Sequence, residues 1–354
     1  MGGGLMQLVA YGAQDVYLTG NPQITFFKVV YRRHTNFSME SIEQTFNGNA
    51  TSGSKVTCTV SRNGDLVSRC YLQVDVDNTG GAEVVDVRDV IDNVEVEIGG
   101  QRIDRQNGEI MYLLNELNQE SGKKAGHADM TTVAPGKTKT LNIPLEFWFC
   151  RNPGLALPLI ALQYHEVKIN VTLGKNLTLS DVKLYVDYIY LDTDERRRFA
   201  QISHEYLIEQ VQHNGDDTLN SGSNKLRLNF NHPCKELIWV CKDKAASSKV
   251  YKSTGSVKLQ LNGHDRFSER SDKYFSRVQP YQHHPNVPNQ DINVYSFGLK
   301  PAEHQPSGTC NMSRIDNATL HINQTDGSDT ASIYAINYNV LRIMSGMGGL
   351  AYSN

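Results

Sequence analysis

The stretch that decides the fold is "VEVEIGGQRIDRQ", which runs from Val94 to Gln106. Apolar residues at 94, 96 and 98 alternate with glutamates at 95 and 97, so one face of a strand is apolar and the other is charged. The two glycines at 99 and 100 then supply backbone that tolerates positive φ, and a second strand-like run follows. The pattern predicts a β-hairpin that buries one face.

The second half of the chain repeats this pattern. "VKLQLNGHDRFSER", Val257 to Arg270, resembles the first stretch and places Gly263 opposite Gly100. "IYAINYNVLRI" likewise resembles "LYVDYIYLDTD", with Tyr338 opposite Tyr188. The number of residues between the matched positions differs between the two pairs, as expected if one loop is shorter in the second copy. The sequence therefore favours two similar β modules in tandem.

Further strand signals fill both modules. "KVTCTVSRNGDLVSRCYLQVDV" (55–76) has alternating runs on either side of Asn63-Gly64, which predicts a tight hairpin there. More strands are expected at 140–149, 164–173 and 181–192, with a helix at 107–119 as an excursion between strands. "TDERRRFAQ" interrupts the strands, which places a domain boundary near 195–212. Eight short strands with their loops take roughly 150–170 residues, so 354 residues accommodate two jelly rolls.

Composition excludes several classes of protein. The chain has 35 basic and 38 acidic residues and a formal net charge of −3, so no global basic field favours nucleic acid. No apolar run approaches the ~20 residues that span a bilayer. The six cysteines are scattered without a CxxC pair and mostly lie in apolar runs, which favours buried reduced thiols.

The sequence offers no convincing catalytic, cofactor or metal site. "SGMGGLA" (345–351) matches a dinucleotide-binding wording, but no helix and second strand follow it, so we expect a glycine-rich tail packed closely on a neighbour. Glu95 and Glu97 share one strand face, whereas glycoside hydrolysis needs two carboxyls flanking a bond. His283-His284 has no second group of ligands at zinc spacing. We therefore expect neither an enzyme nor a bound cofactor or metal.

Asparagine sequons are frequent, but an intracellular β protein rich in Asn and Thr produces them by composition. Two of the sequons, at Asn170 and Asn176, are not taken as candidates, and Asn170 falls within an expected strand. The remaining sequons give the glycan-acceptor candidates: Asn36, Asn49, Asn311, Asn317 and Asn323.

The segment "QDVYLTGNPQITFFKVVYRRHTNFSME" (14–40) places aromatic and aliphatic residues directly before a run of cations. Two interpretations stay open for it. It is either an ordinary first strand with a solvated end, or a segment whose apolar face is completed by another subunit.

Three blocks of sequence carry a family resemblance. They are "LVAYGAQDVYLTGNPQITFFKVVYRRHTNFSME" (8–40), "FNHPCKELIWV" (230–240), and "GLKPAEHQPSGTCNMSRIDNATL" (298–320) with "YAINYNVLRIMSGMGGLAYSN" (334–354). In this order they closely resemble the major capsid protein of nucleocytoplasmic large DNA viruses, of the algal-virus and iridovirus kind.

The resemblance implies an all-β double jelly roll with short helices in its loops. It implies an N-terminal arm at 1–23, a first jelly roll at 24–200 and a second at 201–354. It further implies a homotrimeric, pseudo-hexagonal capsomer in an icosahedral virion shell, assembled in the host cytoplasm. Its partners would be neighbouring capsomers and minor capsid and penton proteins, close to an internal membrane that it does not span and without direct nucleic-acid binding. The chain looks shorter than many relatives, so we expect short outward-facing loops.

On this view the N-terminal segment lies on a neighbouring subunit or on a sandwich. The expected interface residues are Ile24, Phe26, Phe27 and Val29, with Arg32 and Arg33 at the edge of the contact, where they can pair with carboxylates. Rival interpretations are a minor capsid or penton protein, a carbohydrate-binding β-sandwich and a glycosidase. Sugar binding is disfavoured because Trp148 and Trp239 both lie within apolar runs.

Overall fold

The computed structural model describes residues 2–243, 249–324 and 329–353. The chain divides into two units, Met1–Asn36 and Phe37–Asn354. The first unit contains two short helices, α1 (Gly3–Val9) and α2 (Val16–Thr19), and no strand among its described residues. The apolar stretch at 24–31 is therefore not an ordinary first strand.

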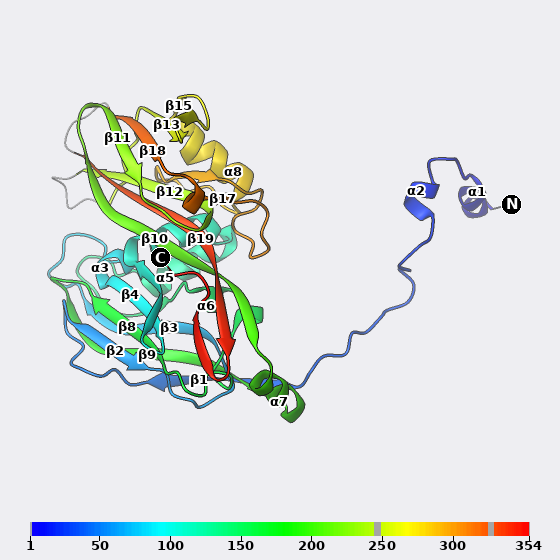
Figure 1. Cartoon of the computed structure of the whole chain (residues 1–354), viewed down its shortest axis with the longest axis horizontal. Coiled ribbons are helices and arrows are strands. Elements are labelled where there is room, and N and C mark those ends of the chain that lie inside the picture. The colour runs from blue at the N-terminus through cyan, green and yellow to red at the C-terminus, as the bar shows by residue number, and fades with distance from the viewer. Residues whose placement is uncertain (1, 244–248, 325–328, 354) are drawn as a thin grey trace. The chain divides into compact units, whose positions relative to one another are not determined.

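The first half of the second unit is a sandwich of two antiparallel sheets, here called the first roll (Figure 1). One sheet has the order β1-β9-β3-β6 with the short β7 also paired to β3, and the other has the order β2-β8-β4-β5. The strands are β1 (Phe37–Gln44), β2 (Lys55–Thr59), β3 (Leu66–Asp77), β4 (Ile91–Ile98), β5 (Gln101–Asn107), β6 (Thr138–Pro144), β7 (Leu157–Pro158), β8 (Val167–Leu173) and β9 (Thr178–Leu191). The helices between them are α3 (Val87–Val90), α4 (Gly108–Asn118), η1 (Ser121–Lys123), α5 (Lys124–Thr131), α6 (Trp148–Arg151) and η2 (Pro153–Leu155).

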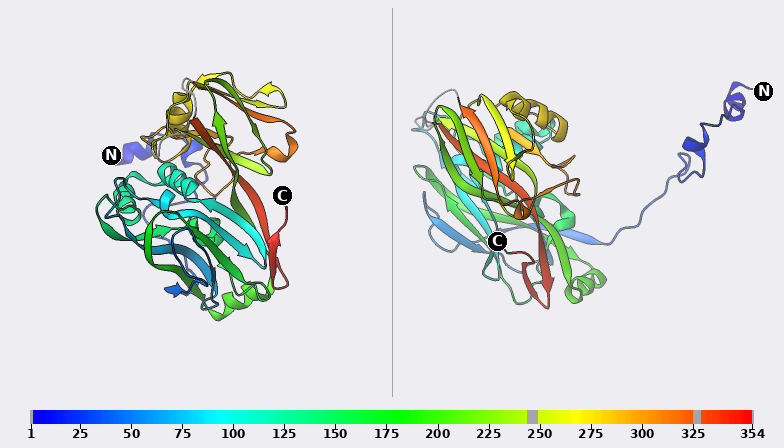
Figure 2. Two further views of the ribbon diagram at one scale, coloured as in Figure 1. Left: turned by 90° about the vertical axis from the view of Figure 1, so that its left-hand side faces the viewer. Right: turned by 45° about the horizontal axis from the view of Figure 1, so that its top comes forward.

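Helix α7 (Thr193–Gln201) leads into a second sandwich, here called the second roll, and the two rolls can be followed from other sides in Figure 2. Its sheets have the orders β10-β19-β12-β16 and β11-β18-β13-β14. The long strands are β10 (His204–Leu219), β11 (Gly222–Leu228), β12 (Pro233–Asp243), β13 (Ser256–Leu261), β16 (Asn293–Ser296), β18 (Ala318–Gln324), β19 (Asp329–Met344) and β20 (Met347–Leu350). The shorter elements are β14 (His264–Asp265), β15 (Arg270–Ser271), the π-helical η3 (Tyr274–Val278), α8 (Gln279–His283), β17 (Cys310–Asn311) and η4 (Met312–Arg314).

The strand orders of the two rolls correspond element by element, which confirms the double jelly roll. The two hairpins that the sequence placed in parallel also correspond. Gly99 and Gly100 have φ of 56° and 85°, while Asn262 and Gly263 have φ of 51° and 81°. Positive φ at both central residues is what a two-residue type I′ hairpin requires.

Two details of the sequence interpretation are wrong. The first is the match of Tyr338 with Tyr188. Tyr188 points into the first-roll core, whereas on β19 the residues that face the second-roll core are odd-numbered, such as Ile333 and Ala335. Tyr338 therefore lies on the opposite face of its strand. The strands correspond, but the residue register differs.

The second wrong detail is the hairpin expected at Asn63-Gly64. It does not form, because β2 and β3 belong to different sheets. Gly64 instead allows close approach to Tyr188, whose Cβ would lie 2.7 Å from an added Cβ.

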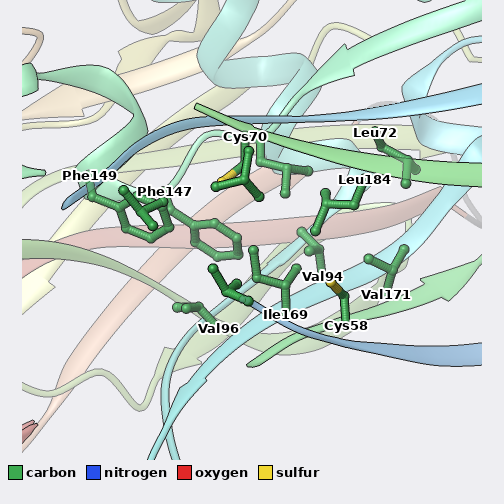
Figure 3. Packing of buried hydrophobic residues seen from close by; sticks show 14 of the residues in the cluster. Cys58, Cys70, Leu72, Val94, Val96, Phe147, Phe149, Ile169, Val171 and Leu184 are labelled. Carbon is green, nitrogen blue, oxygen red and sulfur yellow. The ribbon is translucent and has the colours of Figure 1, made fainter. Parts of the chain in front are cut away.

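Each roll has its own apolar core. In the first roll, alternate residues of β3, β4, β8 and β9 meet between the sheets together with Phe147 and Phe149 (Figure 3). Trp148 is buried beside them, although it begins α6 rather than continuing the strand expected to 149. In the second roll, Trp239 is fully buried against Phe275, at 5.2 Å between ring centroids. All six cysteines are free thiols, of which four are buried, as the sequence predicted.

Candidate assembly surfaces

The contact between the two rolls of one chain is centred on helix α4. Asn107 caps this helix by accepting a hydrogen bond from the Ile110 amide at 2.9 Å. Four of its apolar side chains turn away from the first roll and pack on the outer face of the second-roll sheet β10-β19-β12-β16. The helix residues are Ile110, Leu113, Leu114 and Leu117, and the sheet residues include Ile238, Val240, Tyr334 and Ile336. The contact is therefore a third apolar core, which lies between the rolls.

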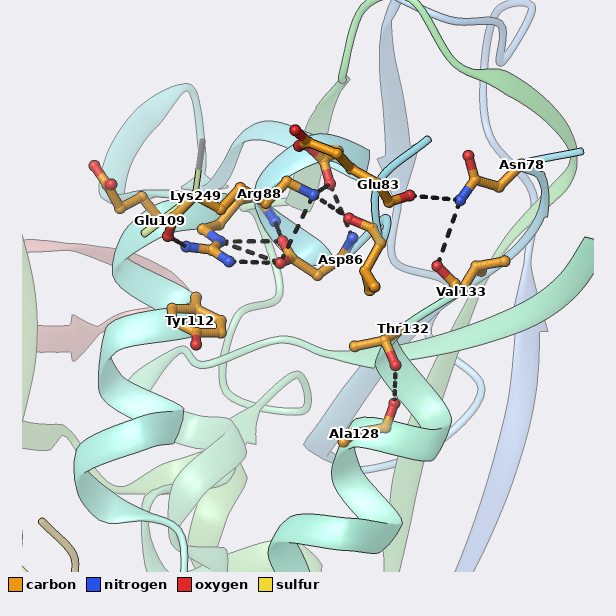
Figure 4. Close-up of polar contacts among 12 residues, drawn as sticks. Asn78, Glu83, Asp86, Arg88, Glu109, Tyr112, Ala128, Thr132, Val133 and Lys249 are labelled. Atoms are coloured by element: carbon orange, nitrogen blue, oxygen red, sulfur yellow. Dashed lines mark hydrogen bonds and ion pairs between the residues drawn. The ribbon is translucent and has the colours of Figure 1, made fainter. Parts of the chain in front are cut away.

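A polar network borders this core (Figure 4). Asp86 caps α3 and holds Arg88, with 2.7 Å between Asp86 Oδ2 and Arg88 Nη2. The Arg88 guanidinium also donates to the Lys249 carbonyl at 2.9 Å and lies over the Tyr112 ring, 4.0 Å from its centroid. Lys249 in turn forms an ion pair with Asp89. Arg88 thus connects the first roll to the connection between β12 and β13 of the second roll.

Buried charges also take part in the contact between the rolls. Glu209 pairs with Arg151 of the first roll and with Lys235, each at 2.8 Å. Burial opposes its ionisation, but His304, Lys235 and Arg151 together lower the pKa of Glu209 to about 2. His284 lies 2.9 Å from Glu236 and 3.0 Å from the side-chain oxygen of Asn118 on α4.

The C-terminal hairpin closes the contact. Strand β20 pairs with β19, and the Gly348 amide lies 3.1 Å from His165 Nδ1 of the first roll. A Cβ at Gly348 would stand 2.7 Å from Leu162 and 3.3 Å from Ile98. The glycine-rich tail therefore packs closely on a neighbouring roll, as its sequence indicated.

The outer face of the first-roll sheet β1-β9-β3-β6 is open by comparison. Tyr71 and Tyr185 stack at its centre, with ring centroids 5.1 Å apart and planes inclined by 8°. Arg69, Tyr71 and Asp187 line one side of a groove of about 1430 Å³, and η1 with α5 lines another. Glu209, Lys235 and His304 of the second roll line it as well, so the groove runs between the two rolls of the chain. Aromatic and arginine side chains in such a position are typical of protein interfaces.

Comparison with known proteins identifies the family of this chain. The profile of the large eukaryotic DNA virus major capsid protein matches residues 195–349, and that of the major capsid protein N-terminus matches residues 25–192. A major capsid protein of Pyramimonas orientalis virus is 59% identical over 399 aligned residues, with 100% of both chains covered. The chain belongs to the major capsid protein family of large eukaryotic DNA viruses. This is a family of structural capsid proteins and not of enzymes.

Solved capsid structures agree with the fold. VP54 of the virus PBCV-1 superimposes with a TM-score of 0.86 at 38% identity, covering 93% of this chain and 100% of that one. A quasi-atomic model of the PBCV-1 capsid gives a TM-score of 0.84 with the same identity and coverage.

The interface residues expected from the sequence all lie in the first unit and are exposed there. The exposed fractions of Ile24, Phe26, Phe27 and Val29 range from 71% to 97%. Arg32 and Arg33 are also exposed. Among the described residues, no ion pair to either arginine occurs within this single chain.

The five glycan-acceptor candidates are exposed asparagines: Asn36, Asn49, Asn311, Asn317 and Asn323. Asn170, by contrast, is only 7% exposed and accepts a hydrogen bond from Thr57 at 2.7 Å. A buried, bonded amide cannot accept a glycan, which agrees with leaving Asn170 out of the candidates.

Sequence reasoning missed the residues that join the rolls. It found α4 but regarded it as an excursion, although an apolar stripe of four residues on a helix between strands indicates that something covers it. His284 was considered only as a zinc ligand, and it instead bridges the two rolls. Glu95 is held by Lys55, Arg102 and Arg105 at 3.3–3.6 Å, which fits a charged strand face rather than a catalytic pair.

Proposed function

We propose that this chain is the main building block of an icosahedral shell of a large DNA virus and that three copies form a pseudo-hexagonal capsomer. The supporting observation is the pair of equivalent jelly rolls joined by a buried contact, in a chain similar over its whole length to capsid proteins. The domains would be an arm at 1–23 and rolls at 24–200 and 201–354.

The N-terminal segment formed by the arm and residues 24–33 would lie on a neighbouring subunit or on a sandwich. Burying an apolar side chain contributes roughly 1.5–3 kcal/mol, so Ile24, Phe26, Phe27 and Val29 could together offset much of an association cost of roughly 4–15 kcal/mol. Arg32 and Arg33 would pair with carboxylates at the edge of that contact. Neighbouring capsomers and minor capsid and penton proteins are the proposed partners. The proposed glycan acceptors are Asn36, Asn49, Asn311, Asn317 and Asn323.

The capsomer would assemble in the host cytoplasm and lie in the virion shell above an internal membrane, without contacting the genome. The near-balanced charge supports the absence of direct nucleic-acid binding. No helix among the described residues is long and apolar enough to cross a bilayer. Sugar stacking on tryptophan is disfavoured, because Trp148 and Trp239 are at most 2% exposed.

Light scattering and negative-stain imaging of the purified protein test the proposal. We expect three times the 39.6 kDa chain mass and hexagonal outlines with a threefold centre. A stable monomer at micromolar concentration would refute it. The double substitution Arg32→Glu and Arg33→Glu should leave the trimer intact and weaken association between capsomers. A monomer peak in this variant would show that Arg32 and Arg33 instead hold the trimer together.

A further inference from the structure

Four of the six cysteines form two pairs that occupy equivalent places in the two rolls. One member of each pair lies on a central strand: Cys70 is on β3 and Cys234 is on β12, and these strands have the same position in their sheets. The other member follows β6 or β16, which also correspond: Cys150 is part of α6 and Cys310 is part of β17. The duplication of the fold is therefore accompanied by a duplicated pair of thiols.

In the second roll, the strand register places the two cysteines face to face. Cys234 and Cys310 are directly opposite each other in the antiparallel pairing of β12 with β17. Opposite residues in such a pair have Cα atoms about 4.5–5.5 Å apart, and a disulfide requires roughly 4.4–6.8 Å. Both side chains pack on the same core. A disulfide can therefore join them without a change of register.

In the first roll, a helical turn brings the second thiol back to the strand. The Leu145 amide donates to the Cys70 carbonyl at 3.0 Å, which fixes the chain beside β3 shortly before α6 begins. The Cys150 amide then donates to the Phe147 carbonyl at 3.0 Å, and Cys150 packs against the core to which Cys70 belongs (Figure 3). A hydrogen bond between the two thiols, together with burial, raises the pKa of Cys70 well above its usual range. The two sulfur atoms thus already lie next to each other.

Each pair joins one buried thiol to one that solvent reaches. Cys70 and Cys234 are at most 2% exposed, whereas Cys150 and Cys310 are only partly buried. Cys150 lines the groove between the rolls, so a small molecule in this groove can reach it. The partly buried member is therefore the one that reacts first with a dissolved reagent.

The remaining two cysteines, Cys58 and Cys241, have a different environment. Both are fully buried, and burial raises the pKa of Cys58 to about 11 and that of Cys241 to about 12. A thiol of this kind behaves as a small apolar side chain and is chemically inert. Cys58 and Cys241 are therefore internal controls for any reaction of the two pairs.

We propose that each roll closes an internal disulfide, Cys70–Cys150 in the first and Cys234–Cys310 in the second, when the protein passes from a reducing to an oxidising environment. The oxidant is a low-molecular-weight disulfide such as oxidised glutathione. The cytosol keeps thiols reduced, whereas extracellular fluid favours disulfides. The timing rests on the proposed function, because a shell protein that assembles in the cytoplasm meets this change on release. The chemistry depends only on the two pairs.

Two exchange steps account for the atoms and electrons. The thiolate of Cys150 or Cys310 attacks one sulfur of the oxidant, so a mixed disulfide forms and the first small thiolate leaves. The sulfur of Cys70 or Cys234 then attacks the protein sulfur of the mixed disulfide, so the internal disulfide forms and the second small thiolate leaves. The two small thiolates take up the two protons of the protein thiols, and the two electrons lost by the protein reduce the oxidant. The raised pKa of Cys70 makes the second step the slower one in the first roll.

The two disulfides would secure the segments that hold the rolls together. The segment closed in the first roll, 71–149, contains α4. The segment closed in the second roll, 235–309, contains His284, which contacts Asn118 of α4. A crosslink that closes a long loop restricts the unfolded chain strongly. Oxidation would therefore lock the contact between the rolls after folding.

Peptide mass spectrometry of the reduced, folded, full-length protein tests the proposal. The protein is incubated with oxidised glutathione, quenched with acid, unfolded and alkylated. Before oxidation, all six cysteines should be alkylated. After oxidation, we expect only Cys58 and Cys241 to be alkylated, and the peptides of each proposed pair to be joined within one chain.

Variants separate the two steps of the reaction. Cys150→Ser should leave Cys70 alkylated and free of glutathione, because the partly buried cysteine starts the exchange. Cys70→Ala should instead leave Cys150 as a stable mixed disulfide with glutathione. Cys310→Ser and Cys234→Ala are the corresponding variants of the second roll, and each should leave the first-roll disulfide unchanged.

A pair that stays reduced in the folded wild type would overturn the inference for its roll. Bonds from either pair to Cys58, to Cys241 or to another chain would overturn it as well. Light scattering on the same sample keeps this result separate from the capsomer. A trimer without internal disulfides would contradict the inference alone, whereas a monomer with both disulfides would refute only the proposed capsomer.

Discussion

Leu113 is the residue whose truncation most directly measures the contact between the rolls. Its side chain is fully buried between α4 and the outer face of the β10-β19-β12-β16 sheet. Leu113→Ala removes three buried carbons, which at about 0.8 kcal/mol each gives about 2.4 kcal/mol. The helix cannot move far into the space, because Asn107 caps one end and Asn118 is held by His284 at the other. The residual cavity should add about 1 kcal/mol or more, for a total of about 3–4 kcal/mol.

The assay is equilibrium urea unfolding followed by tryptophan fluorescence, at one fixed protein concentration because the stability of an oligomer depends on concentration. Trp148 reports on the first roll and Trp239 on the second. Ile202→Ala is the matched control, since this apolar residue is 57% exposed and should cost less than about 0.5 kcal/mol. A loss below about 1 kcal/mol for Leu113→Ala, or equal losses for both variants, would show that the rolls are not held together by this core.

Two further predictions concern the ion pair His213–Asp216 and the C-terminal hairpin. Burial lowers the pKa of His213, but its hydrogen bond to Asp216 outweighs this and raises the pKa overall, while the same bond lowers the pKa of Asp216 to about 2. His213 stabilises the fold fully at pH values below its ordinary pKa, and this stabilisation is lost as the pH rises through its raised pKa. The stabilisation from Asp216 is instead lost as the pH falls from about 4 to about 2. His213→Gln should therefore destabilise by up to about 1 kcal/mol at pH 5 and less at pH 9, measured by urea unfolding; an equal loss at both values would contradict the pairing. Gly348→Val should lower the stability by about 1–3 kcal/mol because its side chain meets Leu162, whereas Gly80→Val, with nothing within 4 Å, should have little effect in thermal unfolding.

The parts of the fold that the sequence predicted are those set by local chemistry. The hairpin at Gly99-Gly100 and its copy at Gly263 are determined by two adjacent residues with positive φ, so their pattern could be recognised directly. Asn63-Gly64 has the same composition, but there the chain crosses from one sheet to the other. Nothing in the local sequence distinguishes a glycine needed for a turn from one needed for close approach to Tyr188.

The assembly surfaces were harder to predict because they depend on what lies opposite. The apolar residues of α4 have the same helical spacing whether they pack on the first roll or on the second. Their spacing therefore predicted a buried helix but not the sheet that buries it. Tyr71 and Tyr185 alternate with core residues and so read as a solvated strand face. Only the strand register brings the two tyrosines together.

The outer sheet faces of the two rolls differ in polarity, as their strands β12 and β3 show. Strand β12 is apolar on both sides, with Leu237 and Trp239 in one core and Ile238 and Val240 in the other. A strand of this kind cannot stay in water, so α4 must cover it as the chain folds. The equivalent strand β3 alternates, and its outer residues Tyr71 and Arg69 have polar groups that water can satisfy. This face can therefore stay in contact with water until another surface covers it. The contact within the chain therefore covers apolar surface that cannot be left in water, whereas the outer face of β3 is polar enough to wait for a second folded molecule.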